Sequence, residues 1–320
     1  IALGWRAVGI VVVYAIAWRH HSEVPRDRRR SFLALVPHIV REWWWWSALY
    51  AGLQAFVHRF AGDDGPARTA ARRLPVLLVH GYAEHSGRYE QVARRFCDAG
   101  FAVTSLDHRG HGQTTGVKRG TIDSFPALVD DLVAMVDGIG TDTPLFVYGH
   151  SMGGLATVRL AERDDSRFAG VIITGASLQA AASVPRPVLA AANLVGRFAP
   201  NLPTIQLDGD AISRVPEVRA DYDADPLNFR GKVTTGTARQ LSVAMDAAMD
   251  EAANITAPIL IMHGSDDTLA DPAGSVRFSS KVGSTDRTVS IWPGCFHELH
   301  NEPEADAVLA TVIDWINGHR

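Results

Sequence analysis

The sequence predicts an α/β fold, a mostly parallel central sheet with helices on both faces. Short apolar runs alternate along the chain with longer segments whose apolar residues recur at helical spacing. A chain that alternates strand and helix in this way builds a parallel sheet covered on both faces. The predicted strands are 75–80, 101–106, 144–148, 170–174, 258–262 and 288–292.

The composition is that of a globular protein with a full core, since 47% of the 320 residues are hydrophobic and 21% are charged. The net charge of -4 is unevenly spread. Residues 1–75 hold 11 Lys and Arg against 5 Asp and Glu, which leaves 20 against 30 for the rest of the chain. This acidic body lacks the clustered basic face that wraps phosphates, so no nucleic-acid partner is expected.

Residues 1–73 are predicted to form a helical leader and linker ahead of a domain at 74–320. Residues 1–18 are apolar except for Arg6, and as a helix they would be about 27 Å long, close to the hydrocarbon thickness of a bilayer. Arginines follow, and the four tryptophans at 43–46 favour the headgroup level of a membrane. We therefore expect the leader to associate with a membrane, across it or on its surface, with the following domain on the cytoplasmic side. A secretory signal and a pair of helices packed on the protein's own core are the alternatives.

The alternation of strand and helix breaks between about residues 178 and 254. Pro185, Pro187, Pro200 and Pro203 divide apolar helical fragments there. Ligands of open α/β sheets bind beyond the carboxyl ends of the strands, so we interpret this insertion as a helical cap over a binding site.

A candidate nucleophile stands at the joint of the third strand and the following helix. The motif GHSMG at 149–153 follows a strand and precedes a helix, which is the context of a nucleophile elbow. This tight turn exposes the hydroxyl of Ser151, and the helix N-terminus favours negative charge beside it.

A serine needs a base to take its proton and a group to orient that base. Asp266 and Asp267 follow the fifth predicted strand, and His297 and His300 follow the sixth. The carboxyl ends of parallel strands meet at one edge of a sheet, so a serine, a carboxylate and a histidine are expected to come together there. The residues alone leave open which aspartate and which histidine take part.

From about residue 75 to its end the chain resembles the bacterial monoacylglycerol lipases of the α/β-hydrolase superfamily, which are similar to serine aminopeptidase S33. The motifs that carry the resemblance are HGYAEHSGRY (80–89), LDHRGHG (106–112), GHSMGG (149–154), HGSDD (263–267) and FHELHNE (296–302). The resemblance implies the α/β-hydrolase fold with a cap, Asp267 as the triad acid and His297 as the base. The leader lies outside it.

The resemblance also implies the groups that bind the reacting ester. The amides of Met152 and Tyr82 are expected to form the oxyanion hole, although the family usually has a smaller residue than Tyr82, whose ring we expect to line or narrow the pocket. The spacing of Glu84 and Arg88 suits an ion pair that holds a loop. The resemblance instead places them, with His300, in a polar pocket for the glycerol head, and His150 also faces the site.

These observations predict a serine hydrolase that cleaves monoacylglycerol to fatty acid and glycerol through an acyl-enzyme. A broader carboxylesterase, a lysophospholipase or an acyltransferase would use the same triad, and a non-catalytic ligand-binding module is the alternative outside enzymes. No cofactor is expected, because no P-loop or dinucleotide fingerprint is present. Cys97 and Cys295 have no metal-ligand spacing, so no metal is expected either. Cys295 is interpreted as a small packed residue, with a reactive thiol as the alternative.

Overall fold

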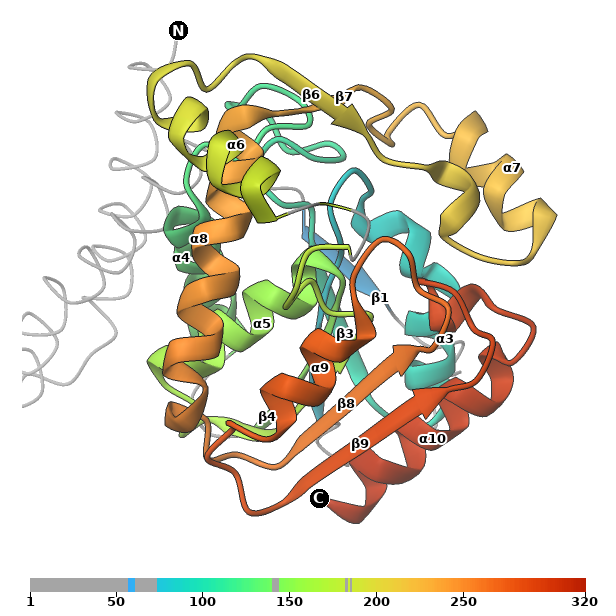
Figure 1. The fold of residues 1–320 in the computed structure, drawn as a ribbon. Coiled ribbons are helices and arrows are strands. Elements are labelled where there is room, and N and C mark those ends of the chain that lie inside the picture. Colours follow the sequence, from blue (N-terminus) through green and yellow to red (C-terminus); the bar gives the residue numbers. More distant parts are fainter. Residues whose placement is uncertain (1–56, 61–73, 140–143, 182–183, 185) are drawn as a thin grey trace, which may run out of the picture. The chain divides into compact units, whose positions relative to one another are not determined.

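The centre of the molecule is a seven-stranded sheet in the order β1-β3-β2-β4-β5-β8-β9 (Figure 1). The computed structural model describes residues 57–60, 74–139, 144–181, 184 and 186–320. Neighbouring strands are parallel except at one edge, where β1 runs antiparallel to β3. The strands are β1 (Val57–Phe60), β2 (Pro75–Val79), β3 (Ala102–Leu106), β4 (Leu145–His150), β5 (Phe168–Thr174), β8 (Ile259–Gly264) and β9 (Arg287–Trp292).

All six predicted strands are present within two residues of their predicted ends, and the predicted α/β fold class is confirmed. The strand β1 was not predicted, because its four residues lie in the range that we interpreted as the helical leader. So short a strand is held by its pairing with β3, and a local sequence pattern does not reveal a partner more than 40 residues away.

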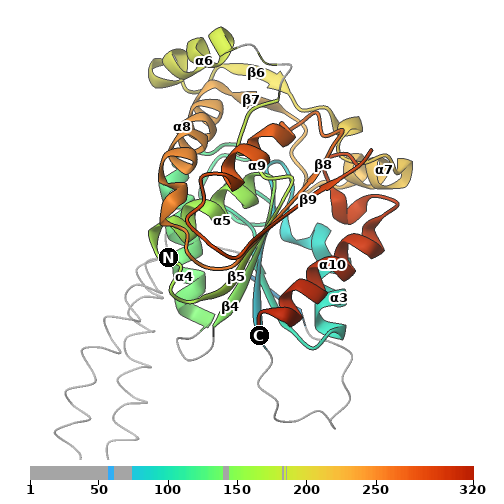
Figure 2. The same cartoon turned by 60° about the horizontal axis from the view of Figure 1, so that its bottom comes forward.

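The two faces of the sheet bury alternate residues of each strand. In β2, Leu77 and Val79 join one apolar cluster, whereas Val76 and Leu78 join the other. The first cluster lies under α4 (Phe125–Ile139), α5 (Met152–Arg163), α8 (Thr235–Glu251) and α9 (Pro272–Ser279). The second lies under α3 (Glu90–Asp98) and α10 (Ala305–Gly318), and Figure 2 shows these two layers on opposite sides of the sheet.

The segment between β5 and α8 lies beyond one end of the sheet in both views (Figures 1 and 2). The segment contacts the loop after β2, where the Phe229 N–H and the Tyr222 hydroxyl both donate to the Ala83 carbonyl, at 2.9 and 3.3 Å, and Asp225 forms a hydrogen bond with His85. Helix α8 differs from the rest of the predicted cap range, since its Ala248 is fully buried in the core. The cap elements are α6 (Arg186–Phe198), β6 (Pro203–Gln206), α7 (Pro216–Ala224) and β7 (Lys232–Thr234), and the short 3₁₀ helices of the chain are η1 (Ser86–Tyr89), η2 (Gly209–Ala211), η3 (Ala252–Asn254) and η4 (Leu299–Asn301).

The predicted membrane-associating leader falls almost entirely outside the described residues, which include only 57–60 of its range. Within the part of the chain that the structure describes, no helix combines the length and the apolar composition needed to cross a membrane.

Candidate active site

Ser151 occupies a strained turn between β4 and α5. Its backbone has φ 56° and ψ -121°, a conformation that residues with a side chain rarely adopt. The turn needs glycine beside it, because a Cβ on Gly153 would lie 2.2 Å from the carbonyl oxygen of Val79. The elbow is therefore pressed against the end of β2 and presents the serine hydroxyl at the carboxyl edge of the sheet.

The structure brings Ser151, His297 and Asp267 into one hydrogen-bonded chain. The Ser151 hydroxyl lies 2.9 Å from His297 Nε2, and His297 Nδ1 donates to Asp267 Oδ2 at 2.6 Å. The neighbouring Asp266 accepts from the Ser265 hydroxyl and is exposed. The position of these side chains thus distinguishes Asp267 from Asp266 and His297 from His300. Within the described residues, His300 makes no hydrogen bond to the serine or the carboxylate.

Asp267 is held by more donors than His297 alone. The amides of Leu269 and Ala270 donate to its Oδ1 at 2.8 and 3.0 Å, and His263 Nε2 donates to Oδ2 at 2.9 Å. Burial raises the pKa of Asp267, but the charges and hydrogen bonds of His297 and His263 outweigh burial and hold that pKa well below its usual range. Sequence reasoning missed His263, whose signal was its place at the end of a strand four residues before Asp267.

The environment of His297 favours its charged form. Burial lowers the pKa of this imidazole, but the charge and the hydrogen bond of Asp267 raise it by more, so the pKa lies above its usual value. Because Nδ1 donates to Asp267, the lone pair of Nε2 is directed to the Ser151 hydroxyl. This arrangement can accept a proton from the serine and stabilise the imidazolium that results.

The two predicted oxyanion donors come from two different parts of the chain. Met152 opens α5, where its N–H has no carbonyl one turn back to bind. Tyr82 lies in the loop after β2, next to Ala83 with φ 67°. The Tyr82 hydroxyl donates to the Gly120 carbonyl at 2.7 Å, and its ring lines a hollow of about 50 Å³ beneath the cap.

Glu84 and Arg88 form the ion pair that their spacing suits. Arg88 Nη1 lies 2.5 Å from Glu84 Oε2, and the same guanidinium makes two bonds to Glu298, of 2.6 and 2.9 Å. The Tyr89 hydroxyl donates to Glu84 Oε1 at 2.6 Å. The charged groups of these buried side chains are thus hydrogen-bonded to one another. Sequence reasoning missed Glu298, although it directly follows His297.

His150 and His300 lie beside the base. The His150 ring is 4.7 Å from that of His297 and 5.0 Å from that of His300, and His300 stacks on Tyr89 at 4.8 Å. Burial lowers the pKa of both, so both are neutral at pH 7. Neither ring nitrogen of His300 has a partner among the described residues. A neutral imidazole with an unused donor and an unused acceptor suits a hydroxyl-bearing ligand.

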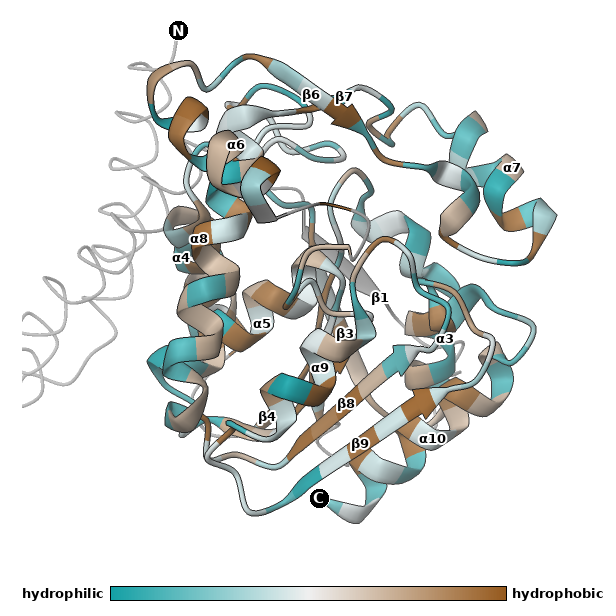
Figure 3. Cartoon of the chain, in the orientation of Figure 1, coloured by the Kyte–Doolittle hydropathy of each residue, from teal (hydrophilic) through white to brown (hydrophobic). Residues whose placement is uncertain are grey.

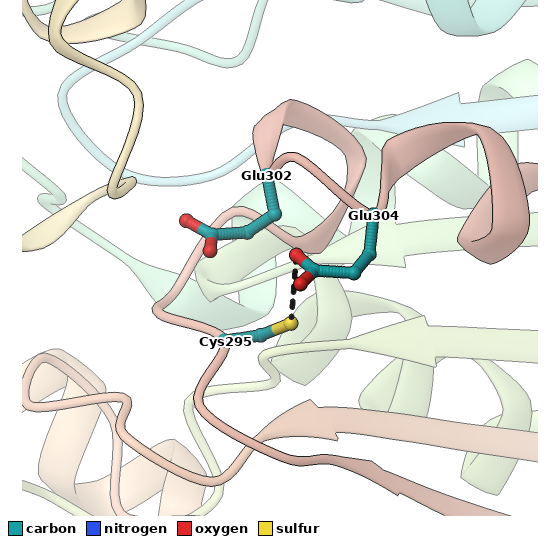
Figure 4. Close-up of side chains that lie close together, drawn as sticks. All are labelled: Cys295, Glu302 and Glu304. Carbon is teal, nitrogen blue, oxygen red and sulfur yellow. Dashed lines mark hydrogen bonds between the residues drawn. The ribbon is translucent and has the colours of Figure 1, made fainter.

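Outside the triad, Cys295, Glu302 and Glu304 lie close together (Figure 4). The atoms with which they could bind a metal ion, one thiol sulfur and two carboxylate oxygens, lie within 4.8 Å of one another. Arg214 from the cap pairs with both carboxylates, so a cation of the protein already occupies the space between them. Burial and the carboxylate of Glu304 raise the pKa of the Cys295 thiol to about 11. The cluster therefore has the character of an ion-pair network around a protonated, packed thiol.

Comparison with known proteins supports the same fold and family. Residues 70–304 match the protein family described as serine aminopeptidase, S33. A monoacylglycerol lipase of Mycolicibacterium smegmatis is 40% identical over 247 residues, which is 76% of this chain and 88% of the relative. The monoglyceride lipase of Homo sapiens is 32% identical over 255 residues, 78% of this chain and 84% of the human protein. The crystal structure of a Paleococcus ferrophilus monoacylglycerol lipase superposes with a TM-score of 0.74 at 29% identity and covers 83% of this chain and 99% of that one.

Proposed function

The chain belongs to the monoacylglycerol lipases of the serine aminopeptidase S33 family and is a carboxylic ester hydrolase, and from this premise we propose that it cleaves monoacylglycerol to a fatty acid and glycerol. The single observation that carries the proposal is the hydrogen-bonded chain from Ser151 through His297 to Asp267, with links of 2.9 and 2.6 Å. The similarity to relatives named as monoacylglycerol lipases over three quarters of the chain supports the substrate class.

The first half-reaction forms an acyl-enzyme. Ser151 Oγ attacks the ester carbonyl carbon while His297 Nε2 accepts the hydroxyl proton, and the Asp267 carboxylate stabilises the imidazolium. The amides of Tyr82 and Met152 hold the oxyanion. The intermediate collapses, the C–O bond to glycerol breaks, and the imidazolium returns its proton to the leaving alkoxide oxygen. The second half-reaction repeats these steps with water as the nucleophile and releases the fatty acid.

The neutral imidazoles of His150 and His300 are polar groups that can bind the glycerol head. Their rings lie within 5.0 Å of the base or of each other, and the nitrogens of His300 are buried without a protein partner among the described residues. In this proposal, Glu84 and Arg88 shape that pocket rather than contact the glycerol, because their charged atoms already bind each other and Glu298.

The proposed substrate is a lipid, and the cap offers a surface that suits a lipid aggregate. Side chains of α6 and the segment after it are apolar and exposed: Leu194 by 64%, Phe198 by 76%, Leu202 by 50% and Ile205 by 57%. Brown stretches on α6 mark part of this surface in Figure 3. Exposed apolar side chains grouped in this way mark an interaction site. The occupant proposed here is a lipid surface.

The leader is proposed as a second attachment, on the cytoplasmic face of a membrane. Fractionation of cells that produce the full chain tests this attachment, and activity confined to the soluble fraction contradicts it.

The decisive experiment measures fatty acid released by the purified full chain from monoacyl-, diacyl- and triacylglycerols of one acyl length, with Ser151→Ala as the blank. We expect strong preference for the monoacyl substrate and no turnover by the variant, which should also lose labelling by a fluorophosphonate probe. Activity retained in Ser151→Ala would refute the mechanism. Equal turnover of all three glycerides, or turnover of a short-chain ester alone, would refute the substrate and leave a broader esterase. A matched lysophospholipid in the same assay tests the lysophospholipase alternative.

A further inference from the structure

Three buried charged residues connect the two loops that carry the halves of the catalytic machinery. We call Glu84, Arg88 and Glu298 the carboxylate bridge. Both glutamate side chains are 3% exposed and the arginine side chain is 10% exposed. The guanidinium binds one carboxylate through Nη1 at 2.5 Å and the other through Nη1 and Nη2 at 2.6 and 2.9 Å. Paired donors of this kind fix direction as well as distance.

One end of the bridge is bonded to the oxyanion loop. Glu84 Oε1 accepts the Gly81 N–H at 2.5 Å, directly before Tyr82, whose amide is a proposed oxyanion donor. Tyr89 donates to the same oxygen at 2.6 Å. The Glu84 carboxylate therefore fixes the backbone of this loop next to Tyr82.

The other end is part of the segment that carries the base. Glu298 follows His297 directly, and its Oε2 accepts from Asn301 Nδ2 at 2.7 Å. Its backbone N–H donates to the Ile212 carbonyl of the cap segment at 2.8 Å. The position of His297 is thus coupled through one residue to the guanidinium of Arg88.

No strand pairing sets the distance between these two loops. The oxyanion loop follows β2 and the base follows β9, and three strands, β4, β5 and β8, lie between them in the sheet. Reacting groups have to be held within about 0.5 Å of the productive geometry. A sheet that twists across several strands does not by itself provide that precision, whereas a direct ion pair between the loops does.

We propose that Glu298 is a positioning residue, which through Arg88 sets the separation between His297 and the oxyanion donors and places a net negative charge beside the base. The charge follows from two carboxylates sharing one guanidinium. The inference rests on the proposed ester hydrolysis, but it does not depend on the glycerol head.

The charged and titratable neighbours of His297 agree with this role. Burial lowers the pKa of the imidazole; Asp267 raises it most, and the carboxylates of Glu298 and Glu84 raise it further. Among the described residues, the neutral His150 packs against the ring at 4.7 Å between centroids, and the neutral His300, which packs on His150, interacts with His297 electrostatically. Loss of one bridge carboxylate therefore weakens the stabilisation of the imidazolium as well as the alignment of the loop.

Glu298→Gln tests the proposal, because the amide keeps the side-chain shape and leaves Arg88 paired one to one with Glu84. We expect kcat to fall by about 10- to 100-fold, the cost typical of a small misplacement of catalytic groups, with KM within about twofold. The acid limb of kcat/KM should move to lower pH, since the imidazolium has lost a favourable charge. The same fall should appear with a short-chain ester that lacks glycerol and in the rate of fluorophosphonate labelling of Ser151.

Arg88→Lys separates geometry from charge. Lysine keeps the positive charge but has no fork of donors for two-point binding, so kcat should fall while the acid limb stays where it is. The matched control is Asp131→Asn, which disrupts the two-point ion pair of Arg109 and Asp131, with bonds of 2.8 Å, outside the triad and the bridge. This control should lose stability to a similar extent and keep the wild-type kcat and pH profile.

Three results would overturn the proposal. The first is wild-type kcat and an unmoved acid limb in Glu298→Gln. The second is a loss confined to glycerol esters or to KM, which would assign the bridge to head-group binding. The third is an equal fall in kcat in Asp131→Asn, which would make the effect one of general stability. Failure of the proposed substrate is distinguishable, because the wild type would then hydrolyse the short-chain ester alone and the comparison of variants on that ester would still hold.

Discussion

Helix α5 buries ten of its twelve residues, whereas helix α7 of the cap buries none. The first helix follows the nucleophile and packs on β4, β5 and α8, while the second contacts the oxyanion loop and Arg88 through the half-exposed Tyr222. The core thus holds reacting groups in place through dense packing, and the cap presents polar and apolar surface to the proposed lipid. This division separates the chemistry, which needs fixed distances, from recognition, which does not.

The largest effect is expected at the end of the core strand β8. Asp267→Asn should lower kcat by about 10⁴-fold, because an amide cannot hold His297 in the required tautomer or stabilise its charge. Asp266→Asn, one residue away and exposed, should stay within about twofold of the wild type. Steady-state kinetics on a monoacylglycerol checks the pair, and a large loss in Asp266→Asn alone would reverse the assignment.

Packing in the core should dominate the free energy of unfolding. Ile172 in β5 is fully buried, and Ile172→Ala should lower that free energy by about 2–5 kcal/mol through lost transfer energy and a cavity. Leu194→Ala on α6, a side chain that is 64% exposed, should change it by less than about 0.5 kcal/mol. Urea unfolding of both variants measures the contrast, and equal losses would mean that α6 is as firmly packed as the sheet.

The pH dependence of kcat/KM should report the base in the core. His297 has to be neutral to accept the serine proton, and its pKa lies above the usual 6.5. Activity should therefore be half-maximal at a pH above 6.5 and fall about tenfold for each further pH unit of acidification. A limb below pH 6 would show that Asp267 does not raise the pKa of the imidazole in the free enzyme.

The smallest effect is expected on the cap surface. Phe198→Ser should leave the free energy of unfolding unchanged within about 0.5 kcal/mol, because the side chain is 76% exposed. It should weaken binding to phosphatidylcholine vesicles by about 3- to 10-fold, since part of the apolar surface that would enter the lipid is lost. Sedimentation with vesicles measures the change, with Val276→Ser, an exposed valine outside the cap, as control. An equal loss of vesicle binding in both variants would show that the cap has no specific role in lipid binding.

Much of the fold followed from local pattern. The six core strands were placed within two residues of their ends, because a buried parallel strand is a continuous apolar run bounded by turn residues. The elbow at Ser151 was equally local, since glycine on both sides is the signature of a strained turn. Strand β1 was missed, because its identity as a strand depends on pairing with β3.

The choice between neighbours was a matter of geometry. Asp266 and Asp267 are adjacent in sequence, yet only the second points its carboxylate at His297 in the structure. The spacing of Glu84 and Arg88 suited a loop-holding pair and the resemblance favoured a substrate pocket, but their third partner, Glu298, lies 210 residues from Arg88. No spacing rule connects residues so far apart.

The sequence by itself determined the order of strands and helices along the chain and the serine at the elbow, because each depends on residues within one turn or one strand of each other. It also determined the class of chemistry, because the carboxyl ends of parallel strands bring a serine, a carboxylate and a histidine to one edge of the sheet. Only the tertiary structure decided which carboxylate orients the base, that His263 supports it, and that Arg88 joins the oxyanion loop to the base loop. The physical reason is that ion pairs and hydrogen bonds act over about 3 Å, and the chain reaches those distances only after its distant segments have packed on the sheet.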